Sequence, residues 1–376
     1  MTDKKLISWL RLHGVMRRFE ADHRRLLSVF PDPEELFAAG ESPFEVRSCL
    51  TPLQRRAVFA SDRREAEETL ELVRRNNLVV LTPDSPLYPE SLKDLKDFPL
   101  ALFCRGQIEC LSEKPRLAVV GSRDASEWAL DMTRDFCENL ARRGVLIISG
   151  GALGVDSAAH RGALDGGGRT VAVLGSGFGS RYLMSNEKLR VGVTESGALM
   201  TELFPFESPT KGTFPKRNRI IAALSNGVFV AEARYKSGSL VTARRARELR
   251  RPVFVHSSFE NADNGAGELL RTGATGVAKA EDISAFFAKN GFETKSPRED
   301  DLLPEELLKD LDPDEKSVME LVIRKKEVYL EDMLALLPDM SPGVLTFVCA
   351  RLTGRGLLVS EEGKYKAGRM LFAAAQ

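Results

Sequence analysis

The sequence is poor in the residues that form disulfides, metal sites and membrane spans. Its five cysteines are scattered, form no Cys-x-x-Cys pair and have no histidine nearby at the spacing of a metal site. No apolar run approaches the roughly 20 residues that cross a bilayer, and the charged N-terminus lacks the apolar core of an export signal. We therefore expect a cytoplasmic protein with reduced thiols, no metal and no membrane contact.

Motifs for common nucleotide cofactors are also lacking. No Gly-x-x-x-x-Gly-Lys-[Ser/Thr] sequence occurs, which argues against ATP hydrolysis by a P-loop. Gly175-Ser176-Gly177-Phe178-Gly179 resembles a dinucleotide fingerprint, but it does not follow the first strand, and no acidic residue ends the second strand to hold a ribose. Asp156 and His160 are spaced i, i+4, which is more typical of a structural hydrogen bond than of a general base. Without a convincing catalytic constellation, we expect neither a cofactor nor an enzyme.

Positive charge is concentrated in one segment, although the chain has 54 basic and 54 acidic residues. Between Phe214 and Leu249, Lys and Arg far outnumber Asp and Glu, from Lys216-Arg217-Asn218-Arg219 to Arg244-Arg245-Ala246-Arg247. Positive charge around a strand and two helix starts favours a surface that binds phosphates. The charge alone is equally compatible with two solvated helix faces, so the argument depends on the loops nearby.

Strands and helices alternate at about 115–291. The predicted domain, residues 73–291, also includes two earlier strands that are expected at its edge. Apolar strands are predicted at 78–81, 100–103, 117–120, 145–148, 170–174, 227–233 and 252–255, with helices at 126–143 and 155–164. Continuous apolar strands alternating with helices are typical of a parallel sheet covered on both faces. The predicted fold class is therefore α/β, with a Rossmann-like, doubly wound, mostly parallel sheet.

Smaller regions flank this sheet. Residues 1–72 place apolar side chains at helical spacing and are predicted to form a helical domain. Residues 292–312 are predicted to be an acidic linker, since the stretch 298–320 carries ten acidic and three basic residues. Residues 313–376 contain three short amphipathic helices and a β-hairpin, the arrangement of a winged-helix domain.

Two loops after predicted strands carry candidate ligand-binding residues. Gly121-Ser122-Arg123 follows one buried strand, and Ser149-Gly150 follows the next. Glycine permits close backbone approach, amides near a helix start accept an anion, and arginine adds a bidentate phosphate contact. Ligands of doubly wound sheets bind at the carboxyl ends of the strands. The loops therefore predict a phosphate site, and the alternative is a pair of tight turns without a ligand.

Two acidic residues lie at the expected ligand edge. Glu202 and Glu232 each end an apolar segment. A catalytic role is open to both, but we favour ion pairs with Arg217, Arg219 or Arg123 that hold those groups in place.

The aromatic residues fall into two groups. Trp9 and Trp128 are expected in the core. Phe214 and Tyr182 each lie beside a basic or glycine-rich loop, so they are better candidates for contact with a base.

Four motifs, in order, resemble one bacterial family. They are Ala118-Val-Val-Gly-Ser-Arg123, Ser149-Gly-Gly-Ala-Leu-Gly-Val-Asp156 with Ala159-His160, Phe214-Pro-Lys-Arg-Asn-Arg-Ile-Ile221, and Glu232-Ala233 followed by Ser237-Gly-Ser-Leu-Val-Thr-Ala243. Their order and spacing are similar to those of DNA-processing protein A (DprA, or Smf) of bacterial transformation, from about residue 78 to 290. The N-terminal helices resemble the family's SAM-like accessory domain, and a C-terminal winged helix occurs in many members.

The resemblance implies a function and a set of site residues. A family member would bind and protect incoming single-stranded DNA during natural transformation and recombination, dimerise through its Rossmann-like domain, and help load RecA without catalytic turnover. DNA or phosphate contacts would come from Gly121, Ser122, Arg123, Ser149, Gly150, Lys188, Phe214, Lys216, Arg217, Asn218 and Arg219. Such contacts ignore base identity, so Arg123→Ala and Arg219→Ala are expected to weaken binding to all sequences alike.

The chain departs from the family pattern at a few positions. Leu183 stands where proline is usual, Ser257-Ser258 replaces Pro-Gly, and Gly267 replaces a common asparagine. The last two changes fall near one end of the predicted sheet, where they could alter the pocket or a dimer contact.

Two other functions compete with this interpretation. A nucleotide phosphoribohydrolase of the lysine-decarboxylase-like group resembles the architecture, but the Pro-Gly-Gly-x-Gly-Thr-x-x-Glu motif of that group is absent. A duplex-binding winged helix is disfavoured because its presumed recognition helix, 341–353, carries only Arg351 as a base, and its wing carries Glu361 and Glu362. Contact with protein is the favoured role for that domain.

Overall fold

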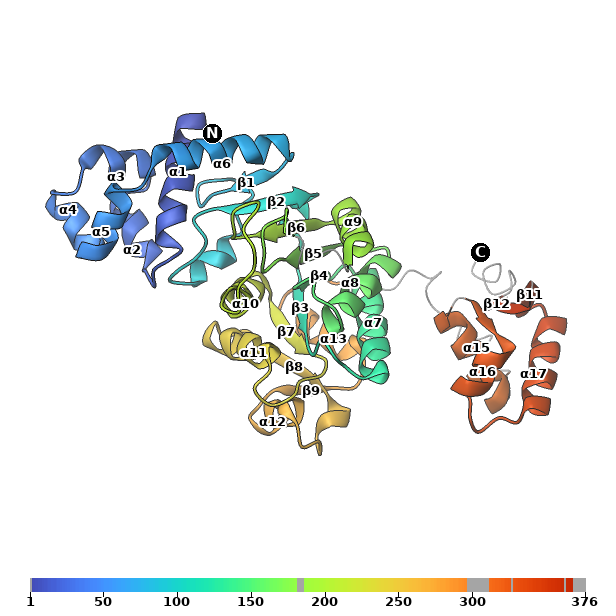
Figure 1. Cartoon of the computed structure of the whole chain (residues 1–376). Helices are drawn as coiled ribbons and strands as arrows, with labels where there is room; N and C mark the ends of the chain where they lie inside the picture. Colours follow the sequence, from blue (N-terminus) through green and yellow to red (C-terminus); the bar gives the residue numbers. More distant parts are fainter. Residues whose placement is uncertain (1, 181–185, 296–310, 326, 362, 368–376) are drawn as a thin grey trace. The chain divides into compact units, whose positions relative to one another are not determined.

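The structure is a computed structural model that describes residues 2–180, 186–295, 311–325, 327–361 and 363–367. The chain divides into two compact units, residues 1–295 and 296–376 (Figure 1). The larger unit contains both the N-terminal helices and the α/β sheet. The domain boundaries expected at residues 72 and 291 remain predictions.

A nine-stranded sheet forms the centre of the larger unit, in the order β1-β2-β6-β5-β4-β3-β7-β8-β9. The strands are β1 (Val79–Leu81), β2 (Leu102–Gly106), β3 (Arg116–Val120), β4 (Leu146–Ser149), β5 (Thr170–Val173), β6 (Ala198–Thr201), β7 (Gly227–Val230), β8 (Val253–His256) and β9 (Thr275–Val277). The strands β6, β5, β4, β3, β7, β8 and β9 are parallel to one another, whereas β1 and β2 add an antiparallel edge. The predicted mostly parallel, doubly wound sheet is confirmed.

Helices cover both faces of this sheet (Figure 1). They are α7 (Glu127–Arg142), α8 (Val155–Asp165), α9 (Glu187–Ser196), α10 (Thr213–Leu224), α11 (Gly238–Glu248), α12 (Gly265–Arg271) and α13 (Ala280–Lys289). Successive side chains of a strand point to opposite faces: Leu117 and Val119 of β3 belong to the core under α7, α8 and α13, while Ala118 and Val120 belong to the core under α10 and α11. Burial on both faces explains why the strand is continuously apolar.

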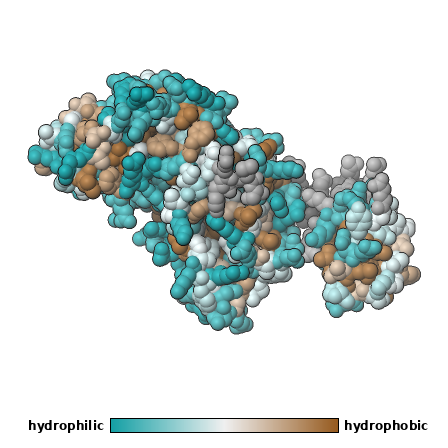
Figure 2. All heavy atoms as spheres, viewed as in Figure 1, coloured by the Kyte–Doolittle hydropathy of each residue, from teal (hydrophilic) through white to brown (hydrophobic). Residues whose placement is uncertain are grey.

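Six helices precede the sheet. They are α1 (Asp3–Met16), α2 (His23–Val29), α3 (Pro33–Ala39), α4 (Phe44–Cys49), α5 (Pro52–Phe59) and α6 (Arg63–Arg75). Trp9 and Leu12 of α1 share a hydrophobic core with Leu100 and Leu102 beside the sheet edge. Hydrophilic residues cover much of the visible face of α1 and α6 (Figure 2). The helices are therefore packed onto the sheet by their apolar faces.

The smaller unit has its own core and a three-stranded antiparallel sheet in the order β10-β12-β11. Its elements are α15 (Pro313–Lys325), β10 (Glu327–Tyr329), α16 (Leu330–Leu336), α17 (Pro342–Gly354), β11 (Leu358–Glu361) and β12 (Lys364–Ala367). The three helices and the hairpin are as predicted, and β10 is an additional strand. Most of the predicted linker, residues 296–310, lies outside the described residues.

Two features limit the chemistry of the described residues. Within the described ranges, none of the helices combines the length and the apolarity that crossing a bilayer requires. The five cysteines are free thiols, and no cluster of His, Cys, Asp and Glu in that part of the chain could hold a metal ion.

A candidate phosphate-binding site at the strand ends

The loops predicted to bind a ligand meet at the carboxyl edge of the sheet. The strand order reverses between β3 and β7, and such a switch point opens a crevice at the carboxyl ends of the strands. The loop after β3 holds Gly121, Ser122 and Arg123, and β4 ends at Ser149. The first turns of α10 pack against both loops, through Phe214 and Arg217.

The loop after β3 is fixed by hydrogen bonds from both sides. The Ser122 N–H donates to the Glu232 carbonyl at 2.9 Å, and the Ser122 carbonyl accepts from the Val155 N–H at 3.2 Å. Gly121 has no room for a side chain, since a Cβ atom there would lie 2.6 Å from Cγ2 of Val155. The backbone of the loop is therefore held in place, while the Arg123 side chain is exposed.

Arg217 lies beneath the second loop. Its buried guanidinium donates to the Val173 carbonyl and occupies the space where a Cβ atom of Gly150 would stand. The Ser149 hydroxyl is also buried and donates to the Val119 carbonyl at 2.7 Å. Burial raises the pKa of the nearby Asp156, although the positive charge of Arg217 opposes this shift. Ser149 and Gly150 are therefore packed tightly against the buried Arg217 side chain and the strand ends.

Phe214 contacts both the loop after β3 and the glycine-rich loop at residues 175–179. In the first turn of α10, its ring lies so close to Gly175 that a Cβ atom there would be 2.7 Å from Cδ1 of the ring. The guanidinium of Arg123 lies over the same ring, 5.0 Å from its centroid, within the range of a cation–π interaction. The predicted residues Arg123 and Phe214, distant in the sequence, therefore form one cluster with the glycine-rich loops.

Arg219 lies in a buried ion-pair network instead of on an open surface. Only 5% of the residue is exposed, and its guanidinium contacts Glu202 at 2.6 Å and Asp97 at 3.1 Å. The expected pairing of Glu202 with an arginine is confirmed. Asn218, also buried, donates from its amide to the Gly238 carbonyl at 3.1 Å and so links α10 to α11.

The two predicted lysines differ in their surroundings. Lys216 donates from Nζ to the Arg17 carbonyl at the end of α1, and burial lowers its pKa. Lys188 is exposed in the first turn of α9. Tyr182 and Leu183, which precede Lys188, lie outside the described residues.

Glu232 and Trp128 depart from the expectations. Glu232 accepts hydrogen bonds from the hydroxyl and N–H of Ser126, the N-cap residue of α7, so it supports a helix start. Trp9 is fully buried as expected, but the prediction of a buried Trp128 is wrong: it is 47% exposed and forms T-shaped ring contacts with His256 and Phe259. Trp128 lies on the exposed side of the first turn of α7, whereas the adjacent Ala129 is fully buried.

His160 has a structural partner. Because the Thr170 hydroxyl donates to the Ile147 carbonyl at 2.9 Å, it accepts from Nδ1–H of His160 at 2.7 Å. The bond expected between His160 and Asp156 is replaced by this bond to Thr170. Burial lowers the pKa of His160 to about 3, so the ring is neutral near pH 7.

Because two histidines are buried with lowered pKa values, we expect the free energy of unfolding to fall in acid. Burial lowers the pKa of His13 to about 3 as well, whereas unfolded histidine titrates near pH 6.5. Below about pH 6.5 the unfolded state therefore binds more protons, and stability that is complete above that pH is lost as the pH falls toward 3. We expect each of these two histidines to lower the free energy of unfolding by about 2 kcal/mol between about pH 7 and pH 5, as measured by urea titration.

A matched variant tests the origin of this loss. The Nε2–H of His13 donates to the Glu202 carbonyl at 2.9 Å, and glutamine keeps a donor without titrating. His13→Gln should reduce the pH-dependent loss by about 2 kcal/mol. Equal losses in both proteins would contradict the assignment to His13.

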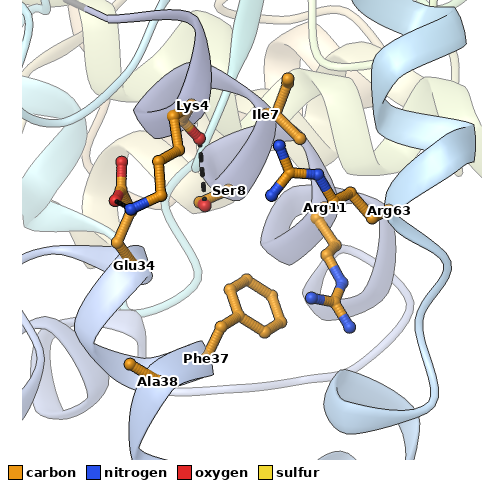
Figure 3. A pocket seen from close by; sticks show the side chains of 8 residues that line it. All are labelled: Lys4, Ile7, Ser8, Arg11, Glu34, Phe37, Ala38 and Arg63. Carbon is orange, nitrogen blue, oxygen red and sulfur yellow. Dashed lines mark hydrogen bonds and ion pairs between the residues drawn. The ribbon is translucent and has the colours of Figure 1, made fainter.

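A hollow among the N-terminal helices offers no comparable site. It measures about 210 Å³ and is lined by Lys4, Ile7, Ser8, Arg11, Glu34, Phe37, Ala38 and Arg63 (Figure 3). Its cations already have partners. Lys4 pairs with Glu34 at 2.6 Å, and Arg11 lies over Phe37 and donates to Ser61. The strand-end cluster is therefore the better candidate.

The structure also explains one departure from the family pattern. A Cβ atom at Gly267 would collide with the Ala262 carbonyl. The Gly267 N–H donates a hydrogen bond to Oδ1 of Asn264, the N-cap residue of α12, at 2.9 Å. Asparagine does not fit this local backbone. Ser257 and Ser258 form a short 3-10 turn with Phe259.

The fold and the strand-end loops together define a Rossmann-like α/β protein with a glycine-rich site that carries arginines. The family model for DNA recombination-mediator protein A matches residues 79–288, and the chain belongs to that family. Protein Smf of Escherichia coli is 39% identical over 278 residues, 73% of each chain. DNA processing protein DprA of Streptococcus pneumoniae is 39% identical over 202 residues, 53% of this chain and 71% of the relative.

Solved structures show the same similarity. DNA processing protein A from Streptococcus pneumoniae gives a TM-score of 0.60 at 30% identity, covering 74% of this chain and 95% of the other. The protein from Helicobacter pylori gives 0.52 at 31% identity, covering 57% and 96%. The family resemblance inferred from the four sequence motifs is confirmed.

Proposed function

We propose that this protein binds single-stranded DNA without regard to base sequence, through the loops after β3 and β4 and the start of α10. The observation that carries the proposal is the cluster of exposed Arg123, Phe214 and the tightly packed loops at the switch point of the sheet. Arginine contacts phosphate without reading sequence, and an aromatic ring stacks on any base. The similar Helicobacter pylori protein is described as having a unique single-stranded DNA binding mode, which supports the proposal.

The predicted residues take different parts in this proposal. Arg123 and Lys188 are exposed and are proposed to contact phosphates directly. Ser149, Arg217 and Asn218 are buried and bonded to backbone carbonyls, so they are proposed to hold the loops in shape. Loops that are already held in shape by buried side chains lose little conformational entropy when DNA binds.

Arg123→Ala tests the proposal most directly. Loss of one charge-assisted phosphate contact should weaken binding to oligo-dT by about ten-fold or more, and should reduce the log-log salt slope by about 0.7. Fluorescence anisotropy with a labelled oligo-dT, a mixed-sequence strand and a matched duplex across a salt series measures both. The loss should be equal for the two single strands.

Arg64→Ala is the matched control. Arg64 is a surface arginine of α6, outside the basic segment, whose side chain is 80% exposed, so its removal changes net charge equally but should leave affinity nearly unchanged. Equal loss in both variants would point to a general charge effect and contradict the assigned site. Weak binding of the unmutated protein to single strands, together with release of base from a nucleoside monophosphate, would favour the nucleotide hydrolase alternative.

We further propose that the protein acts in the cytoplasm as a homodimer formed through the sheet-containing region, delivers single strands to RecA during natural transformation and has no catalytic turnover. Membership of a recombination-mediator family supports this proposal. Faster RecA nucleation on single strands in the presence of the protein is the expected result. No acceleration, with DNA binding intact, would contradict the RecA step alone. Light scattering measures the molar mass in solution, which should be twice that of one chain if the protein is a homodimer.

For the C-terminal unit we propose a protein contact in preference to a duplex. Arg351 of α17 pairs with Glu315 and Asp312, each at 2.6 Å, so the charge of that helix is already neutralised. Hydrophobic residues are visible on this unit in Figure 2. Val344 and Phe347 of α17 are 41% and 62% exposed.

A further inference from the structure

A second aromatic ring stands beside the candidate site. Phe206, in the loop after β6, is 53% exposed. Its ring lies directly against the backbone of Gly179, where any Cβ atom would collide with ring atoms Cδ1 and Cε1. Single exposed hydrophobic residues are normal on protein surfaces, so exposure alone decides nothing; the support beneath the ring is what distinguishes Phe206.

Phe206 and Phe214 rest on one glycine-rich loop. Phe214 packs on Gly175 and Phe206 on Gly179. Four residues span at most about 14 Å, and a stacked strand advances about 3.4 Å per nucleotide. A separation of up to about 14 Å corresponds to about four such steps, so the two rings are within reach of nucleotides a few positions apart on one single strand. The segment that resembled a dinucleotide fingerprint serves here as a support for two rings.

Backbone hydrogen bonds fix the loop that carries Phe206. The Gly177 N–H donates to the Glu207 carbonyl, and the Gly179 N–H donates to the Pro205 carbonyl, each at 2.8 Å. These bonds join the residues before and after Phe206 to the glycine-rich loop. The ring consequently has little freedom to fold back onto the surface.

The N-terminal helices brace the same loop. Arg17, after the end of α1, forms two parallel contacts with the Glu207 carboxylate, at 2.9 and 2.7 Å, and bidentate pairs of this kind fix orientation as well as distance. The Arg17 guanidinium also lies 4.8 Å from the Phe204 ring centroid, and Phe204 packs edge-on against His13. Phe204 is thus anchored inward, while Phe206 is left facing outward.

We propose that Phe206 is a second base-stacking position, which receives a nucleobase of the single strand whose phosphate Arg123 contacts. The proposal rests on the function proposed above and adds a residue to it. Stacking accepts every base, because each has a π-face. The ligand at this position is therefore the base itself, and neither the phosphate nor the sugar is needed for the contact.

Phe206→Ala tests the assignment through DNA with and without bases. Stacking contributes about 1–3 kcal/mol per base, so affinity for oligo-dT should fall about 5- to 150-fold. The salt slope should not change, because no phosphate contact is lost. On an abasic strand of the same length, the variant and the unmutated protein should bind equally, and Phe206→Trp should restore binding to oligo-dT.

The controls separate this inference from the proposed function. Phe44→Ala removes another exposed aromatic ring, 72% exposed on α4, and should change nothing. If Arg123→Ala weakens binding but Phe206→Ala does not, the stacking role is overturned and the proposed function stands. If Phe206→Ala weakens binding to the abasic strand equally, the residue supports the loop and does not stack. If the unmutated protein binds no single strand, the proposed function fails first.

Discussion

Replacing Arg219 by alanine is expected to lower the free energy of unfolding by about 3–5 kcal/mol, because it leaves the charge of Glu202 buried without its partner. Both residues are buried, and their contact measures 2.6 Å. Taking a carboxylate out of water is tolerable only while a partner of opposite charge is held in place. Urea titration followed by tryptophan fluorescence measures the loss, and both tryptophans, Trp9 and Trp128, report on residues 1–295.

A surface pair provides the control for Arg219. Arg74 contacts Asp3 at 2.5 Å, and both side chains are more than half exposed, so Arg74→Ala should cost no more than about 1 kcal/mol. The double variant Arg219→Met with Glu202→Met should recover most of the lost stability, since it removes both buried charges together. Unchanged stability combined with lost DNA binding would instead make Arg219 a direct DNA contact, as the sequence predicts.

Gly154→Ala is expected to damage both stability and DNA binding. Gly154 precedes α8 with φ of +75°, and a Cβ atom there would lie 2.5 Å from the Ser122 carbonyl oxygen and collide with that of Arg123. The left-handed backbone costs an alanine about 1–2 kcal/mol, and overpacking against a fixed backbone adds about 1–3 kcal/mol. Because the displaced loop carries Arg123, affinity for oligo-dT should also fall on the order of ten-fold, as for loss of one charged contact.

Gly167→Ala isolates the backbone part of that effect. Gly167 has φ of +65° and no heavy atom within 4 Å of the position of a Cβ atom. It should lose only the about 1–2 kcal/mol of the left-handed conformation and retain its affinity for DNA. Similar losses in the two variants, in urea titration and anisotropy alike, would show that the space beneath the Ser122-Arg123 loop does not matter.

The sequence predicts those elements whose signal is local. Strand β3 is buried on both faces, so its five residues form a continuous apolar run apart from Arg116. The glycine-rich loops follow such strands directly, and this order along the chain is enough to place them at the carboxyl edge of a parallel sheet. In contrast, β9 and β10 have three residues each, of which two are exposed, and so they carry no apolar pattern to detect.

Contacts between distant segments are beyond sequence reasoning. Nothing near Asp97 or Arg219 indicates that the two meet, and the pairing of Arg17 with Glu207 depends on how the N-terminal helices pack on the sheet. The direction of Trp128 escapes prediction for a related reason: composition favours a buried tryptophan, but the side of the first turn of α7 on which it lies depends on the tertiary fold.

Deleting the N-terminal helices would also disturb the loops of the site, because α1 and the residue after it are bonded to them. A chain begun at residue 73 would lose the His13 donor to the Glu202 carbonyl and the Arg17 partner of Glu207. It would also uncover the Leu100 and Leu102 side chains, which now share a core with Trp9. A truncated allele that fails to bind DNA would therefore report on the shape of the strand-end loops, and not on a strand gripped by the missing helices.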